Sequence, residues 1–127
     1  MGSHRFAERA DGERFFAGQA EGLRAFQAVA EVIEQCGGAE LRVATTQVGW
    51  ARRREFVALW DPRRWLGERG APVVVSVALP ALDAGSVWKQ VVEVRRGLWQ
   101  HHREIHSAAD LDEALVAAIR SAYAAAE

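Results

Sequence analysis

The stretch Trp99–Leu115, WQHHREIHSAADLDEAL, carries two successive periodicities that decide the C-terminal half of the fold. Up to Ile105 the side chains alternate between two rows, as on a β-strand, and the apolar residues that follow recur at helical spacing. Between them, Ser107 and Asp110 have the Ser-x-x-acid form of a capping box. The stretch therefore predicts a strand that leads, through Ser107, into a helix reaching about Ala125.

Two further segments supply neighbours for this strand. The segment 87–94, followed by Arg95-Arg96-Gly97, predicts a hairpin partner joined by a tight reversal. Val73–Leu79, VVVSVAL, is almost continuously apolar and rich in β-branched residues. This composition indicates a central strand that is buried on both faces.

The N-terminal half adds a helix and a second group of strands. Apolar residues at helical spacing predict a helix from about Gln19 to Cys36, and Gly37-Gly38 predicts its left-handed C-terminal cap. Residues 40–46 alternate as in a half-buried strand, and residues 48–51 and 55–60 form a predicted hairpin.

We therefore expect an α+β domain with a mainly antiparallel sheet of about five to six strands, and an N-terminal and a C-terminal helix packed on one face. Residues 1–10 are polar and unpatterned, so we expect a flexible arm there, part of which resembles an expression remnant. Residues 11–127 should form a single domain. The second sheet face then needs a cover: a second copy of the chain, a ligand groove or the loop that carries Trp65.

Composition restricts the setting of the protein. The formal net charge of -1 gives no overall attraction for nucleic acid or for an anionic membrane. The lone Cys36 excludes an internal disulfide and suits a reducing cytoplasm. No apolar run approaches the ~18 residues of a membrane span, so we expect a cytoplasmic protein without a membrane partner.

Short motifs are spread over about residues 15–125, and the most specific of them is the histidine-rich segment His101–Asp112. The others are Phe15–Gly18, Val43–Trp50, Arg52–Phe56 and Ala122-Tyr123. Together they resemble the bacterial domain-of-unknown-function family numbered 5655. The resemblance implies a compact α+β domain that occurs alone or beside other modules, with no established activity and no catalytic residues to carry over.

Strand alternation places His102, Glu104 and His106 in one row. Two imidazoles and a carboxylate could bind zinc or iron, or could act as acid and base. No further Cys or His lies in an obvious supporting position, so the simpler interpretation is a polar strand face. His101 falls on the other row with Trp99, where a histidine is more often a hydrogen-bonded core or rim residue.

The bend Arg52-Arg53-Arg54 concentrates positive charge, and tryptophans lie on both sides of it in the sequence. Arginine with aromatic side chains is typical of anion sites and of surfaces that stack single-stranded nucleic acid. Carboxylates nearby in the sequence and the near-zero net charge weaken the nucleic-acid interpretation.

We favour a non-catalytic binding or interaction module without a cofactor. Its partner would be a second copy of the chain, a small anionic ligand or another protein. The alternatives are a metal-dependent or acid–base enzyme that uses His102, Glu104 and His106, and nucleic-acid binding through Arg52–Arg54. The residues expected to bind lie on the sheet face or its arginine-rich loops: Trp50, Arg52, Arg54, Trp60, Trp65, Trp88, Trp99 and His101.

Overall fold

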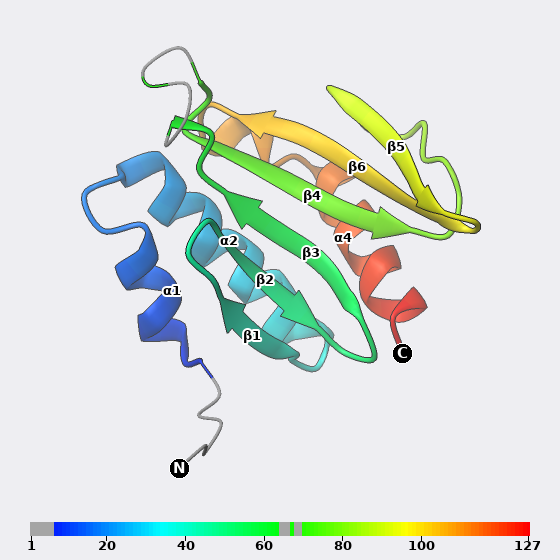
Figure 1. The fold of residues 1–127 in the computed structure, drawn as a ribbon, viewed down its shortest axis with the longest axis horizontal. Coiled ribbons are helices and arrows are strands. Elements are labelled where there is room, and N and C mark those ends of the chain that lie inside the picture. Colours follow the sequence, from blue (N-terminus) through cyan, green and yellow to red (C-terminus); the bar gives the residue numbers. More distant parts are fainter. Residues whose placement is uncertain (1–6, 64–66, 68–69) are drawn as a thin grey trace.

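The computed structural model describes residues 7–63, 67 and 70–127. In chain order the elements are α1 (Arg9–Phe15), α2 (Ala20–Cys36), β1 (Glu40–Val43), β2 (Gln47–Ala51), β3 (Glu55–Trp60), β4 (Val73–Leu79), β5 (Gln90–Arg95), β6 (Leu98–Ile105), the 3₁₀ turn η2 (Ala108–Asp110) and α4 (Glu113–Ala125). The strands form one six-stranded sheet in the order β1-β2-β3-β4-β6-β5, and all neighbours are antiparallel (Figure 1). The predicted α+β class is confirmed.

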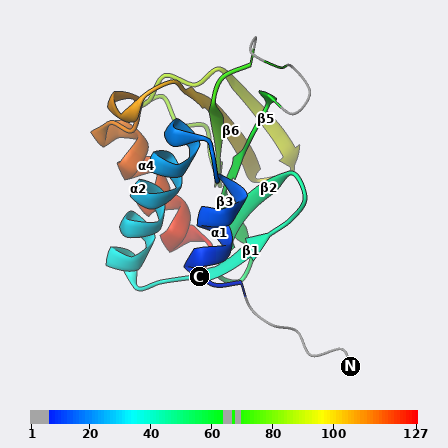
Figure 2. The same ribbon diagram turned by 90° about the vertical axis from the view of Figure 1, so that its left-hand side faces the viewer.

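The two long helices, α2 and α4, pack against one face of the sheet (Figure 2). Phe26 of α2 and Leu115 of α4 are fully buried against the alternate strand residues Val48, Leu59 and Val75. We call this side of the sheet the helix-covered face. The intervening strand residues point to the opposite side, the open face, which no described helix covers (Figure 2).

Helix α2 follows the prediction closely. It begins at Ala20 and ends at Cys36, where Gly37 and Gly38 take positive φ angles of 128° and 88°. The Gly38 N–H donates to the carbonyl of Ile33 at 2.9 Å, so one of the last unpaired carbonyls of the helix is satisfied. In the part of the chain that the structure describes, no helix is long and apolar enough to cross a membrane.

Strand β4 is the central strand, and every one of its residues is buried, as predicted. Val74, Ser76 and Ala78 face the open side, yet Ser76 is only 6 % exposed. Their cover comes from the flanking strands, because Trp60 on β3 lies opposite Val74 and Gln100 on β6 lies opposite Ala78. Long neighbouring side chains therefore shield β4 without a second layer.

Two strands are shorter than predicted. β1 ends at Val43 rather than at residue 46, because the Ala44 N–H donates to the Gln47 carbonyl (2.8 Å) and turns the chain into β2. β5 begins at Gln90 rather than at residue 87. Trp88 instead folds back onto the preceding loop, where its indole N–H donates to the carbonyl of Asp83 at 3.0 Å.

The predicted capping box does not cap the long C-terminal helix. Ser107 and Asp110 form the box, but it caps only the short 3₁₀ turn η2. The N-cap of α4 is Asp112, whose Oδ1 accepts the Leu115 N–H at 3.0 Å. Arg103 on β6 fixes the same carboxylate with two contacts of 3.1 and 3.2 Å. The long helix therefore starts after a second cap that the sequence interpretation overlooked.

The N-terminal boundary lies earlier than residue 11. Ala7 forms a β-bridge with Leu41, and α1 begins at Arg9, so this segment belongs to the folded domain and not to an arm. Asp11 occupies the third helical position, where its carboxylate accepts the N–H of Glu8 at 2.7 Å.

Candidate functional site

The open face of the sheet carries a pocket of about 390 Å³. Its floor includes the small residues Ala58 on β3 and Ser76 on β4, which pair with each other. Gly49 on β2 pairs with Ala58 and lies under Glu55. Larger side chains on the flanking strand positions form the walls. We call this hollow the open-face pocket; its polar or aromatic side chains are Gln47, Glu55, Phe56, Trp60, Ser76, Gln100 and His102.

A chain of hydrogen bonds crosses the pocket from β3 to β6. The indole N–H of Trp60 donates to Ser76 Oγ (3.1 Å), and Ser76 Oγ lies 2.7 Å from Nδ1 of His102. Because burial lowers the pKa of His102, the neutral ring is favoured. The serine hydroxyl then donates to Nδ1, and the ring proton sits on Nε2. The chain holds three side chains from three strands in one arrangement.

The Glu55 side chain forms the wall of the open-face pocket on the side of β2. Its carboxylate lies so close to Gly49 that a Cβ at that position would collide with Oε1. The Gln47 amide donates to Oε1 at 3.3 Å, and Oε2 accepts no hydrogen bond from any residue that the structure describes. Burial raises the pKa of Glu55, and the charge of Arg42 and the Gln47 hydrogen bond offset that burial only in part. The pocket therefore contains a carboxylate with spare accepting capacity.

Gln100 contributes a second unsatisfied acceptor. Its Oε1 is buried and accepts no hydrogen bond from the residues in the described ranges. A buried polar atom without a partner destabilises a protein by about 1–3 kcal/mol. Gln100 lines the pocket, and a ligand that donates to its Oε1 would remove this penalty once a rotation of the side chain exposes the buried atom.

A family profile for a domain of unknown function, DUF5655, matches residues 13–126. The chain belongs to this family. No curated protein and no solved structure gives a significant match. The pocket of this DUF5655 domain lies wholly inside the matched region, since its lining runs from Gln47 to His102.

Of the seven residues expected to bind that the structure describes, Trp60 alone lines the pocket of the DUF5655 domain. Trp50 stacks on Phe26 in the core, with ring centroids 5.4 Å apart. His101 is fully buried on the helix-covered face, where its Nε2 accepts the N–H of Asp83 at 3.0 Å. Trp88 contacts His101 edge to face at 5.0 Å between centroids. These aromatic residues therefore build the core and its rim; Trp99, which is half-buried, belongs to the same strand row as His101.

The arginine bend is docked on the end of α4. The Arg52 guanidinium lies 4.1 Å from the ring centroid of Tyr123 and donates to the Tyr123 carbonyl at 3.0 Å. The Arg53 N–H donates to the carbonyl of Ala126 at 2.9 Å. Arg54 is half-buried, with an Nε that has no acceptor among the described residues. Trp65, which was expected to join this surface, lies outside the described residues, as do Arg64 and Arg69.

The histidine row of the DUF5655 domain does not converge on one point. His102 Nδ1 is directed at Ser76, whereas Glu104 binds Lys89 at 2.7 Å and lies 3.7 Å from His106. The hydrogen bond from Lys89 lowers the pKa of Glu104. Within the described ranges, no group of three His, Cys, Asp or Glu side chains is placed to hold a metal ion.

Sequence reasoning missed four polar residues of the pocket: Gln47, Glu55, Ser76 and Gln100. One signal was present, because Ser76 is the single polar residue in the apolar run Val73–Leu79. Strand alternation also puts Gln100 on the same side of its strand as His102. What was absent was the strand order, which brings Ser76 opposite His102.

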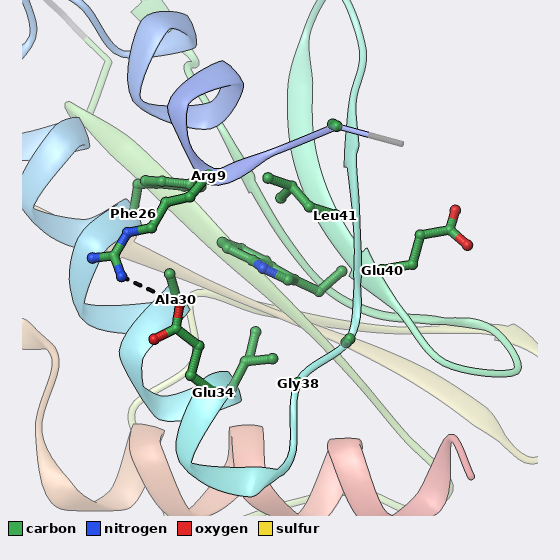
Figure 3. Close-up of a pocket in the computed structure, with 11 residues that line it drawn as sticks. Arg9, Phe26, Ala30, Glu34, Gly38, Glu40 and Leu41 are labelled. Atoms are coloured by element: carbon green, nitrogen blue, oxygen red, sulfur yellow. Dashed lines mark hydrogen bonds and ion pairs between the residues drawn. The ribbon is translucent and has the colours of Figure 1, made fainter. Parts of the chain in front are cut away.

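A second hollow, of about 460 Å³, lies between α2 and β1 (Figure 3). Phe26, Ala30 and Leu41 are among its mainly apolar lining residues. Arg9 and Glu34 form an ion pair of 3.3 Å beside it (Figure 3). These two charged groups satisfy each other, whereas the open-face pocket presents acceptors that lack donors.

Proposed function

We propose that this DUF5655 domain is a non-catalytic binding module and that the open-face pocket holds a small organic ligand. The unsatisfied Oε1 of Gln100 carries the proposal, because a buried acceptor without a donor is rare in the absence of a functional reason. The wall formed by Trp60 supports it, since aromatic walls with a few polar groups are typical of small-molecule sites.

The open position of the pocket also supports a binding role. Trp60 and His102 are half-buried and keep part of their surface in contact with solvent. Their rings meet edge to face at 6.5 Å between centroids, so a ligand meets side chains that are already fixed. Fixed side chains lose little conformational entropy on binding.

Acid–base catalysis is the second candidate, and the 2.7 Å contact between Ser76 and His102 favours it. Two observations favour binding over this chemistry. Ser76 Oγ already accepts the Trp60 N–H, and Ser76 is buried in the middle of a strand. Hydrolysis of an activated ester by the wild type that disappears in Ser76→Ala would establish catalysis in place of binding.

We further propose a cytoplasmic setting, which rests on the lone Cys36. Self-association and binding of a protein partner are separate proposals. Light scattering across a concentration series tests the first, because a dimer requires a mass near twice 14.0 kDa.

A fragment titration followed by amide NMR tests the main proposal. Fragments that bind should shift the Trp60 indole N–H and the Gln100 side-chain amide resonances. Trp60→Phe should weaken these fragments, while Trp88→Phe, which alters the loop beside the opposite face, should leave them unchanged. Binding that never perturbs Trp60 or Gln100 would place the ligand site elsewhere.

A further inference from the structure

We propose that the open-face pocket takes a planar nitrogen cation of the amidinium or guanidinium class, which donates hydrogen bonds to Glu55 and Gln100. This inference rests on the proposed function and names the ligand class of the same site. It follows from the hydrogen-bonding groups that remain unused, from the charge of the lining, and from the shape of the walls.

Three donors of the pocket are used within the protein, whereas His102 Nε2–H and the Gln100 amide N–H groups make no hydrogen bond with a described residue. Trp60 donates to Ser76, and Ser76 to His102, while the Gln47 amide donates to Glu55. The groups without a donor are oxygen atoms: Oε1 of Gln100 and Oε2 of Glu55. A ligand that satisfies them must bring N–H or O–H donors.

The charge of the lining favours a cation. Among the described residues that line the pocket, Glu55 is the only acidic side chain and none is Lys or Arg. Arg42 on β1 forms its ion pair with Glu40 at 2.8 Å, and its charge acts on Glu55 without a direct contact. A cation that reaches Glu55 therefore meets a partly buried carboxylate that makes no direct ion pair with a described residue.

The walls favour a planar group. Trp60 and His102 provide aromatic surface on two neighbouring sides, and Ala58 contributes a small residue to the floor. Amidinium and guanidinium groups pack against aromatic rings while their N–H donors remain free in the plane. A compact ammonium ion could also lie over an aromatic ring, but it lacks the planar set of N–H donors that can reach two separate oxygen atoms.

An isosteric series tests the class without altering the protein. Benzamidinium, benzamide and benzoate share one shape and carry charges of about +1, 0 and −1 at neutral pH. Titrated into the wild-type domain and followed by amide NMR, benzamidinium should bind at least about tenfold more tightly than benzamide, with shifts at Trp60 and Gln100. Benzoate should show the weakest binding of the three.

Two isosteric variants of the protein test the ligand class independently of the ligand series. Glu55→Gln removes the charge and should reduce benzamidinium affinity by about tenfold or more, whereas Gln100→Glu adds a carboxylate and should increase it. Well-dispersed amide spectra would confirm that both variants are folded. If either variant does not fold, the ligand series on the wild-type domain still shows whether the pocket prefers a cation.

The outcomes separate this inference from the proposed function. Benzoate or benzamide binding in the pocket as tightly as benzamidinium would overturn the cation class and leave the pocket as a ligand site. Benzamidinium affinity that is unchanged in Glu55→Gln would also overturn it. If none of the three shifts the pocket resonances while other fragments do, the class is wrong; if no fragment of any kind does, the proposed function fails as well.

Discussion

Ser76 Oγ on β4 lies 2.7 Å from Nδ1 of His102, the residue directly opposite it on β6. The same oxygen accepts the indole N–H of Trp60 from the other neighbouring strand. One hydroxyl therefore joins three strands on the open face, at a position where a continuous apolar strand would otherwise present only small apolar side chains. The open-face pocket is built around this connection.

Ser76→Ala should destabilise the domain by about 1–3 kcal/mol, because it leaves the Trp60 N–H and the His102 Nδ1 without a partner. Urea unfolding followed by fluorescence measures the change. Ser121→Ala, at an exposed position of α4, is the matched control and should change stability by less than about 0.5 kcal/mol. Equal changes in the free energy of unfolding of the two variants would show that the Ser76 hydroxyl does not stabilise the fold.

Gly49→Ala should displace the Glu55 carboxylate, because a Cβ at this position collides with Oε1. We expect weaker binding of any ligand that uses Glu55 with little change in stability, because the displaced carboxylate is the far end of a flexible side chain. Gly85→Ala is the control, since a Cβ there meets only Asp83 at an ordinary 3.4 Å. Benzamidinium titration of both variants, followed by amide NMR, makes the comparison, and unchanged affinity in Gly49→Ala would contradict the close approach.

Glu55→Gln should stabilise the free domain at neutral pH. The pKa of Glu55 is raised by burial, so the stability that this carboxyl contributes is fully present below the unfolded pKa of about 4.3 and is lost as the pH rises through the folded value. At neutral pH the ionised carboxylate is therefore unfavourable, and the amide removes that effect. The melting temperature should rise, whereas Glu31→Gln, on the exposed side of α2, should leave it nearly unchanged. A fall in Glu55→Gln would mean that the carboxylate has a stabilising partner.

His102 should make the domain less stable at mildly acidic pH. Its pKa is lowered by burial, so its contribution is fully present above the unfolded pKa of about 6.5 and declines as the pH falls below that value. Urea unfolding between pH 7.5 and pH 5, at constant ionic strength, measures the slope. In His102→Gln the slope should be smaller; an identical slope would assign the pH dependence to other groups.

Arg52→Ala should cost about 1–3 kcal/mol, because Arg52 joins the β2–β3 bend to the last turn of α4 through the Tyr123 ring and carbonyl. Arg53→Ala is the control, since the Arg53 side chain is exposed and its backbone N–H makes the contact with α4. If Arg52→Ala is as stable as Arg53→Ala but abolishes retention on single-stranded DNA, the bend would serve nucleic acid and not the fold.

Local signals in the sequence were sufficient for most elements. Gly37-Gly38 ends α2 because two residues with positive φ are available there, and Val73–Leu79 is the central strand because its apolar run suits burial on both faces. The start of α4 could not be chosen from the sequence, because Ser107 and Asp112 are both competent caps. The choice depends on Arg103, which fixes Asp112 from β6.

The site was harder to predict because it depends on pairing between strands that are distant in the sequence. Alternation places Ser76 and His102 each on one side of its own strand, but only the pairing of β4 with β6 brings them together. Trp50 shows the reverse case. It is adjacent to the arginine bend in the sequence, yet its strand position turns it toward Phe26 in the core.

A crystal structure of the domain soaked with small fragments, benzamidinium among them, would locate the ligand site. We expect density in the open-face pocket, with ligand N–H groups within hydrogen-bond distance of Gln100 Oε1 and Glu55. Fragments that occupy only the hollow between α2 and β1, with the open-face pocket empty at saturating concentration, would contradict it.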